Sequence, residues 1–263
     1  MIKIKCHSQY NHFPNHNAEG KDKAFELWND GKIWEYLNEN KEGGSALLIE
    51  PRPLQYETYK FLETRYDRFK YIFTHDSQLL AQAPNARPLL YWNEYEINDE
   101  PKTKDISMIC GTKAMCPLHI NRQRLAEDLE DKIDVLGDWD GGERVSIHDA
   151  YAPYRFAVVI ENYIDDLWFT EKILNAFANK TVPIYLGARQ IDRVFNHDGI
   201  IQCDSLEKIK AVVEVIQSRG AAKIYEQMME EIEENFKAVQ KYKNFEDYFI
   251  KNYEHLMKES IKK

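Results

Sequence analysis

Residues 154–187 read YRFAVVIENYIDDLWFTEKILNAFANKTVPIYLG, and this stretch decides the fold of the chain. Within it, residues 156–161 predict a buried strand, residues 170–179 a helix, and residues 182–186 a second strand. A strand, a helix and another strand in this order are typical of a parallel sheet. Polar side chains gather where the first strand gives way to the helix. Because open α/β sheets bind ligands at the carboxyl ends of their strands, this stretch predicts a ligand site.

The same alternation of strands and helices continues on both sides of this stretch. Strands are predicted over 46–49, 71–73, 87–92, 106–110, 133–137 and 200–202, and helices over 56–63, 77–83, 121–132 and 206–217. Residues 22–40 predict one or two short helices, and the polar residues 98–105 predict a linker. The chain therefore predicts an α/β fold with an N-terminal domain over 1–102 and a C-terminal domain over 103–263, which ends in a helical segment.

Charge and hydropathy narrow the classes of partner. The chain of 263 residues has a net charge of −9, which argues against a broad surface that tracks nucleic-acid phosphates. No apolar run approaches the roughly 18 residues of a membrane span, so we expect a cytoplasmic protein. Phe245, Phe249 and Tyr253 recur at helical spacing near the C-terminus. This pattern predicts a helix that docks on the body of the protein, and a peripheral membrane helix is the alternative.

The second half carries no glycine-rich phosphate loop. Neither G-x-G-x-x-G after a strand nor a P-loop is present. Any bound phosphate must therefore be held by side chains and by helix N-termini.

The 154–187 stretch closely resembles the donor-binding signature of glycosyltransferase family 10, the α-1,3/4-fucosyltransferases. The matching segments are Tyr154-Arg155-Phe156, Glu161-Asn162, Thr170-Glu171-Lys172 and Val182-Pro183-Ile184-Tyr185-Leu186-Gly187. A weaker similarity covers Ser107–Cys110, the helix with Arg122, and Val135-Leu136-Gly137. In two places the chain departs from the pattern, with Ile160 for the family's Phe and Trp168 for its Tyr.

The resemblance implies an inverting transfer of L-fucose from GDP-β-L-fucose to a glycan hydroxyl. It also implies two Rossmann-like domains in a GT-B-like arrangement, no obligatory metal or cofactor, and an acceptor of the lipopolysaccharide or N-acetyllactosamine kind. Two alternatives stay open. One is a family relative that uses another nucleotide sugar, which Trp168 permits, and the other is a non-catalytic module that binds a sugar nucleotide or a glycan.

The resemblance assigns donor binding to residues of the second half, namely Arg122, Glu161, Asn162, Trp168, Thr170, Glu171 and Lys172. Lys172 and Arg122 supply positive charge for the pyrophosphate, with Arg124 as a rival to Arg122. Thr170 is expected near the cap of a helix whose N-terminal amides help. Glu171 is predicted to accept hydrogen bonds from the sugar and to take part in catalysis, whereas Glu161, Asn162 and Trp168 face sugar, ribose or base.

Glu50 is the candidate general base. It ends the predicted buried strand of the first half, as the strand-end glutamate of the family's acceptor domain does, and Pro51 forces it into extended geometry. Transfer passes through an oxocarbenium-like state, so it needs a base for the acceptor hydroxyl and stabilisation of the departing diphosphate. The alternative is that Glu50 is only a turn residue before proline.

Overall fold

The structure is a computed structural model that describes residues 2–18, 23–92, 95–242 and 244–262. The chain divides into two compact units. Unit 1 comprises Met1–Trp92, Asp165–Trp168 and Tyr242–Lys263, and unit 2 comprises Asn93–Ile164 and Phe169–Lys241. The division therefore differs from the predicted boundaries, because residues 93–102 belong to unit 2 and the C-terminal helix belongs to unit 1.

The described residues of unit 1 form a five-stranded parallel sheet whose strands follow one another in chain order. The strands are β1 (Ile4–His7), β2 (Phe25–Asn29), β3 (Ser45–Leu48), β4 (Ile72–Thr74) and β5 (Ala86–Pro88). The helices are α1 (Ile33–Asn38), α2 (Tyr56–Arg65), α3 (Ser77–Gln82) and α10 (Phe245–Lys262), and the 3-10 helix η1 (Asp30–Lys32) follows β2.

The prediction of helix for the start of residues 22–40 was wrong. Residues 25–29 form β2, which pairs with β1 on one side and with β3 on the other. Phe25 and Leu27 alternate with side chains of the opposite face, as a strand between two neighbours requires. Only α1 of that segment is an α-helix, and it begins after Asp30.

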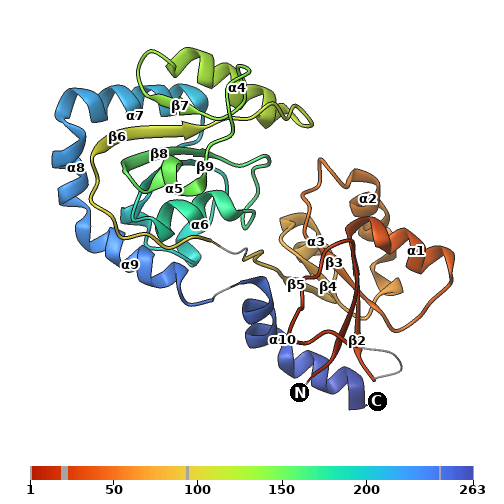
Figure 1. Ribbon diagram of the computed structural model, residues 1–263. Coiled ribbons are helices and arrows are strands. Elements are labelled where there is room, and N and C mark those ends of the chain that lie inside the picture. The colour runs from red at the N-terminus through yellow and green to blue at the C-terminus, as the bar shows by residue number, and fades with distance from the viewer. Residues whose placement is uncertain (1, 19–22, 93–94, 243, 263) are drawn as a thin grey trace. The chain divides into compact units, whose positions relative to one another are not determined.

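The order of the strands explains why α10 belongs to unit 1. Helices α1, α2 and α3 share one hydrophobic cluster with Trp28, Leu48 and Ile72, so they cover the same face of the sheet. The opposite face carries Phe25 and Phe73 and needs its own cover. The rings of Phe249 and Tyr253 on α10 lie 4.8 and 4.9 Å from that of Phe73, and Figure 1 shows α10 beside β2.

The predicted docking of the C-terminal helix is thus confirmed. Its residues Phe245, Phe249, Tyr253 and Met257 are buried, so its aromatic face is used inside unit 1. Among the described helices, none combines the length and the apolar character that a membrane crossing requires.

The described residues of unit 2 form a second five-stranded parallel sheet, in the order β10-β9-β8-β6-β7. The strands are β6 (Lys104–Ile109), β7 (Asp134–Leu136), β8 (Tyr154–Ile160), β9 (Val182–Leu186) and β10 (Ile201–Gln202). The helices are α4 (Pro117–Leu129), α5 (Ile147–Tyr151), α6 (Glu171–Ala178), α7 (Leu206–Arg219), α8 (Ala221–Gln227) and α9 (Met229–Val239). The predicted strand–helix–strand of the 154–187 stretch is confirmed as β8, α6 and β9, and with it the α/β class with two parallel sheets.

The strand order of unit 2 reverses between β6 and β8, since β7 lies outside β6 and the chain then returns to β8. Helices α4, α7 and α8 share one core with Met108, Phe156 and Ile184, while α5 and α6 pack near β6 and β8 from the other direction. A reversal of this kind opens a crevice at the carboxyl ends of the two strands. Unit 2 therefore has a ready place for a ligand between β6 and β8.

Candidate functional site

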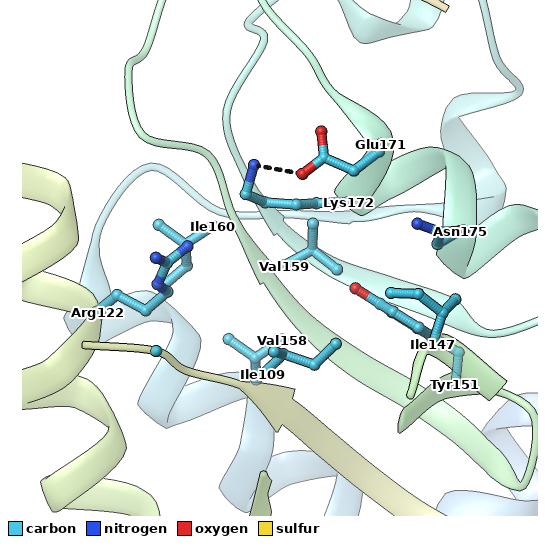
Figure 2. Close-up of a pocket in the computed structure, with 11 residues that line it drawn as sticks. Ile109, Arg122, Ile147, Tyr151, Val158, Val159, Ile160, Glu171, Lys172 and Asn175 are labelled. Carbon is cyan, nitrogen blue, oxygen red and sulfur yellow. Dashed lines mark hydrogen bonds and ion pairs between the residues drawn. The ribbon is translucent and has the colours of Figure 1, made fainter. Parts of the chain in front are cut away.

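A pocket of about 210 Å³ lies at this reversal point of unit 2. The last residues of β6 and β8, Ile109 and Ile160, line it, together with residues from three helices and one loop. These are Arg122 of α4, Ile147 and Tyr151 of α5, Glu171, Lys172 and Asn175 of α6, and Gly111 of the loop after β6, while Val158 and Val159 of β8 complete the lining. Figure 2 shows the charged side chains of Arg122, Glu171 and Lys172 on one side and the apolar Ile109 and Val158 below them. The pocket thus has a charged end and an apolar wall.

Thr170 fixes where α6 begins. It has extended backbone angles, and its hydroxyl accepts a hydrogen bond from the amide of Lys172, which makes it the N-cap of the helix. The amides of the first turn and the positive end of the helix dipole therefore lie beside the side chains of Glu171 and Lys172. The prediction of a capping threonine is confirmed.

Glu161 holds this helix start in place through hydrogen bonds. It is fully buried, and its carboxylate accepts hydrogen bonds from the Thr170 amide at 2.9 Å and from the Thr170 hydroxyl at 2.7 Å. Lys172 Nζ lies 3.4 Å from the same carboxylate. Burial raises the pKa of Glu161, and Lys172 acts against that rise. Because its oxygens are already engaged, Glu161 supports the site rather than facing a sugar or a base as the sequence predicted.

Lys172 and Arg122 bring two cations to the same pocket from different helices. Lys172 Nζ also donates to Glu171 at 3.2 Å and to the Thr170 hydroxyl at 2.8 Å. Burial alone lowers the pKa of Lys172, but Glu161 and Glu171 outweigh it and raise the pKa above its ordinary value. Arg122 has a buried Nε without a hydrogen-bond partner among the described residues. Lys172 and Arg122 therefore give this end of the pocket two positive charges that attract an anion.

The rival arginine has a different position. Arg124 is exposed and lines another hollow, formed by residues around the start of α4 that include Met115 and Ile120. The structure therefore places Arg122, and not Arg124, in the pocket with Lys172.

Sequence reasoning missed two polar lining residues, Tyr151 and Asn175. Asn175 is four residues after Glu171 on α6, so helical spacing places both on one face, and this signal was available in the sequence. From the sequence, Tyr151 could stack on the guanine of a donor, but an aromatic residue is more often part of a core. Its hydroxyl is directed into the pocket in Figure 2.

Asn162 and Trp168 do not join the residues that line the pocket. The carbonyl of Asn162 accepts a hydrogen bond from the Cys116 thiol at 3.2 Å. Trp168 is buried in unit 1, where its ring centroid lies 4.2 Å from that of His75. The ring of Trp168 is thus packed against a histidine at an interplanar angle of 47°.

Glu50 follows β3 in unit 1, and its side chain is exposed. Its peptide is anchored, because its amide donates to Asp30 Oδ1 at 3.2 Å and its carbonyl accepts from the Tyr59 hydroxyl at 2.8 Å. Glu50 is therefore an exposed residue on an anchored backbone.

Gly187 leaves room for Glu161 and Tyr185. A Cβ atom at this position would collide with the Tyr185 hydroxyl and would lie 2.6 Å from Glu161 Cγ. We expect Gly187→Ala to lower the free energy of unfolding by about 1–3 kcal/mol, as overpacking of a tight interior does. Thermal unfolding measures this, with Gly31→Ala as the control because a Cβ at Gly31 meets no atom within 4 Å. Equal effects of the two substitutions would contradict the crowding at Gly187.

The chain is similar to known proteins in sequence and in fold. Residues 101–230 match the family model described as the C-terminal region of glycosyltransferase family 10 (fucosyltransferase). No curated protein matches the chain. A crystal structure of an alpha1,3-fucosyltransferase superposes with a TM-score of 0.60 at 13% identity, and the match covers 92% of this chain and 79% of that one.

Two further solved structures are similar to the chain in fold. An alpha1,3-fucosyltransferase with GDP has a TM-score of 0.60 at 12% identity, with coverage of 100% of this chain and 90% of that one. A GtfA/B complex has a TM-score of 0.51 at 11% identity and covers 89% and 61%. At these identities the likeness concerns the fold, which is GT-B-like with two Rossmann-like units. The match over residues 101–230 includes the 154–187 motif and confirms the resemblance seen in it: the chain carries a glycosyltransferase family 10 domain.

Proposed function

We propose that the protein is an inverting fucosyltransferase that moves L-fucose from GDP-β-L-fucose to a hydroxyl of a glycan acceptor. The coarser assignment, a glycosyltransferase, rests on the family domain and the fold. One observation carries the finer proposal. Lys172, Arg122 and the N-terminus of α6 converge on one pocket at the reversal point of the sheet, as a nucleotide diphosphate requires where no glycine-rich loop exists.

The charged end of the pocket suits the diphosphate of the donor. Lys172 is a point charge for phosphate oxygens, and Arg122 offers a planar set of donors. Both also stabilise the charge that develops on GDP when the glycosidic bond breaks, and a preorganised site of this kind lowers the barrier. We propose that this makes a divalent metal unnecessary.

The volume of the pocket indicates how much of the donor it holds. At about 210 Å³ it is smaller than the roughly 300–1,000 Å³ of sites that enclose a complete drug-sized ligand. We propose that it takes the diphosphate at the charged end and one ring of the donor against Ile109, Ile147 and Tyr151. Glu171, whose side chain is about two-fifths exposed, then accepts hydrogen bonds from sugar hydroxyls.

The chemical step is a displacement at the anomeric carbon of fucose. Glu50 removes the proton of the acceptor hydroxyl, the oxygen forms a bond to that carbon, and the bond to the diphosphate breaks. The configuration inverts because the acceptor attacks opposite the leaving group. We keep Glu171 as the residue that stabilises the sugar during transfer.

A transfer assay with several donors tests the proposal. The chain is incubated with GDP-fucose, GDP-mannose or UDP-galactose and a panel of glycans that includes N-acetyllactosamine, with and without EDTA, and mass spectrometry detects products. Among the three donors, we expect only GDP-fucose to give a product, both with and without EDTA. Transfer only from another donor would replace fucose by that sugar, and binding without transfer from any donor would favour a non-catalytic module.

A further inference from the structure

We propose that Asp30 is a positioning residue for the general base, which holds the peptide of Glu50 so that its side chain is presented in one geometry. This inference rests on the proposed function, because it takes Glu50 as the base. It concerns a residue of unit 1 that the 154–187 motif and the family match over residues 101–230 do not include.

Asp30 lies directly after β2, beside the end of β3 where Glu50 follows. Its Oδ1 accepts hydrogen bonds from the amides of Ile49 at 2.9 Å and Glu50 at 3.2 Å. Its Oδ2 accepts from the side-chain amide of Asn29 at 2.8 Å. One carboxylate thus bonds the two peptides that carry the chain from β3 to Glu50.

Both the burial and the backbone conformation of Asp30 lower the stability of the fold. The Asp30 side chain is only 8% exposed, and its φ of 42° lies in the left-handed region that residues with a Cβ seldom adopt. Burial raises the pKa of Asp30 to about 7, and the charge of Glu50 adds to the rise. Backbone strain and a buried carboxylate in one residue are typical of functional sites.

The other side of the Glu50 peptide is fixed as well. The hydroxyl of the fully buried Tyr59 donates to the Glu50 carbonyl at 2.8 Å, and Pro51 confines Glu50 to extended geometry. The amide, the carbonyl and the following bond are therefore all restrained, while the Glu50 side chain is exposed.

Asp30 is itself held by a chain of polar groups that leads to the loop between β1 and β2, which contains His12 and His16. The Asn29 side chain donates to the Leu47 carbonyl at 3.1 Å and accepts from Ser8 Oγ at 2.9 Å. Ser8 Oγ lies 3.2 Å from His12 Nε2. This chain orients Asn29 so that its amide faces Asp30, which gives the otherwise unassigned loop a supporting role.

A double-mutant cycle of Asp30→Asn and Glu50→Gln tests the inference. Asparagine keeps the size of the side chain and tolerates a left-handed backbone, but its amide nitrogen repels that of Asn29. Transfer from GDP-fucose is measured across the glycan panel, with GDP-fucose affinity and thermal unfolding as checks on folding. Asp67→Asn is the control, because Asp67 is an exposed carboxylate of the same unit.

We expect Asp30→Asn to lower kcat by about 10- to 100-fold, as a misplaced catalytic group does, with the KM for GDP-fucose within about 2-fold of wild type. In the Glu50→Gln background the same substitution should change kcat by less than about 2-fold, because Asp30 acts through Glu50. If Asp30 has only a structural role, Asp30→Asn should lower kcat by the same factor in the wild-type protein and in the Glu50→Gln variant.

Equal factors, or wild-type kcat for Asp30→Asn, would overturn the inference and leave the proposed function intact. Wild-type protein that transfers no fucose to any glycan would overturn the proposed function first, and the inference with it. Asp30→Gly is the second variant if Asp30→Asn fails to fold, since glycine adopts this backbone freely and also lacks the carboxylate.

Discussion

Replacing Lys172 with alanine is expected to weaken GDP binding by about 10- to 100-fold, because a hydrogen bond to a charged phosphate contributes about 1.5–3 kcal/mol. The substitution also leaves Glu161 buried without its cation, with only the two hydrogen bonds from Thr170. Removal of one partner of a buried pair costs about 3–5 kcal/mol. We expect a smaller loss of unfolding free energy, about 2–3 kcal/mol, since a quarter of the Lys172 side chain is exposed.

Calorimetry with GDP and thermal unfolding separate these two effects. Adding Glu161→Gln to Lys172→Ala removes the stranded charge, so stability should partly return while GDP affinity stays low. Lys210→Ala is the matched control, because its ion pair with Asp128 is at the surface and is expected to change stability by no more than about 1 kcal/mol. If Lys172→Ala bound GDP as tightly as wild type, the diphosphate would not lie at the charged end of the pocket.

Replacing Glu50 with glutamine is expected to lower the rate of transfer by about 10²- to 10⁴-fold, the range that general-base catalysis contributes. GDP-fucose affinity should stay near wild type, because Glu50 is in unit 1 and the residues that line the donor pocket are all in unit 2. Stability should also change little, since the Glu50 side chain is exposed and its peptide bonds are kept. Single-turnover transfer together with GDP-fucose calorimetry measures both quantities.

Glu57→Gln is the control for this experiment. Glu57 is also an exposed carboxylate of unit 1, in the first turn of α2, and its replacement should leave transfer unchanged. Transfer that survives in Glu50→Gln would assign the proton to another group, and loss of GDP-fucose binding would show that Glu50 acts on the donor.

The local motif predicted the core of the site well. Thr170 caps a helix, Glu171 and Lys172 begin it, and β8 and β9 flank it, because capping and strand patterns depend on residues close together in the chain. Arg122 was assigned to the same site through the weaker similarity around its helix, with Arg124 as a rival, and the structure places Arg122 with Lys172 at the reversal point of one sheet.

Features that depend on packing between distant residues could not be predicted. The spacing of Glu161 and Thr170 places them near each other but does not say that Glu161 accepts both hydrogen bonds of Thr170 and so becomes a buried support. The assignment of α10 to unit 1 depends on the in-order sheet, which leaves Phe73 and its neighbours uncovered. Trp168 packs with tilted rings against His75, a partner almost a hundred positions away in sequence.

The most direct test of the central claim, that the pocket of unit 2 binds the donor diphosphate, is GDP calorimetry of Arg122→Ala against Arg124→Ala. The two arginines are two residues apart on α4, but only Arg122 lines the pocket. We predict that Arg122→Ala weakens GDP binding by about 10-fold or more and that Arg124→Ala leaves it unchanged. Unchanged affinity in Arg122→Ala, or a loss confined to Arg124→Ala, would contradict the account.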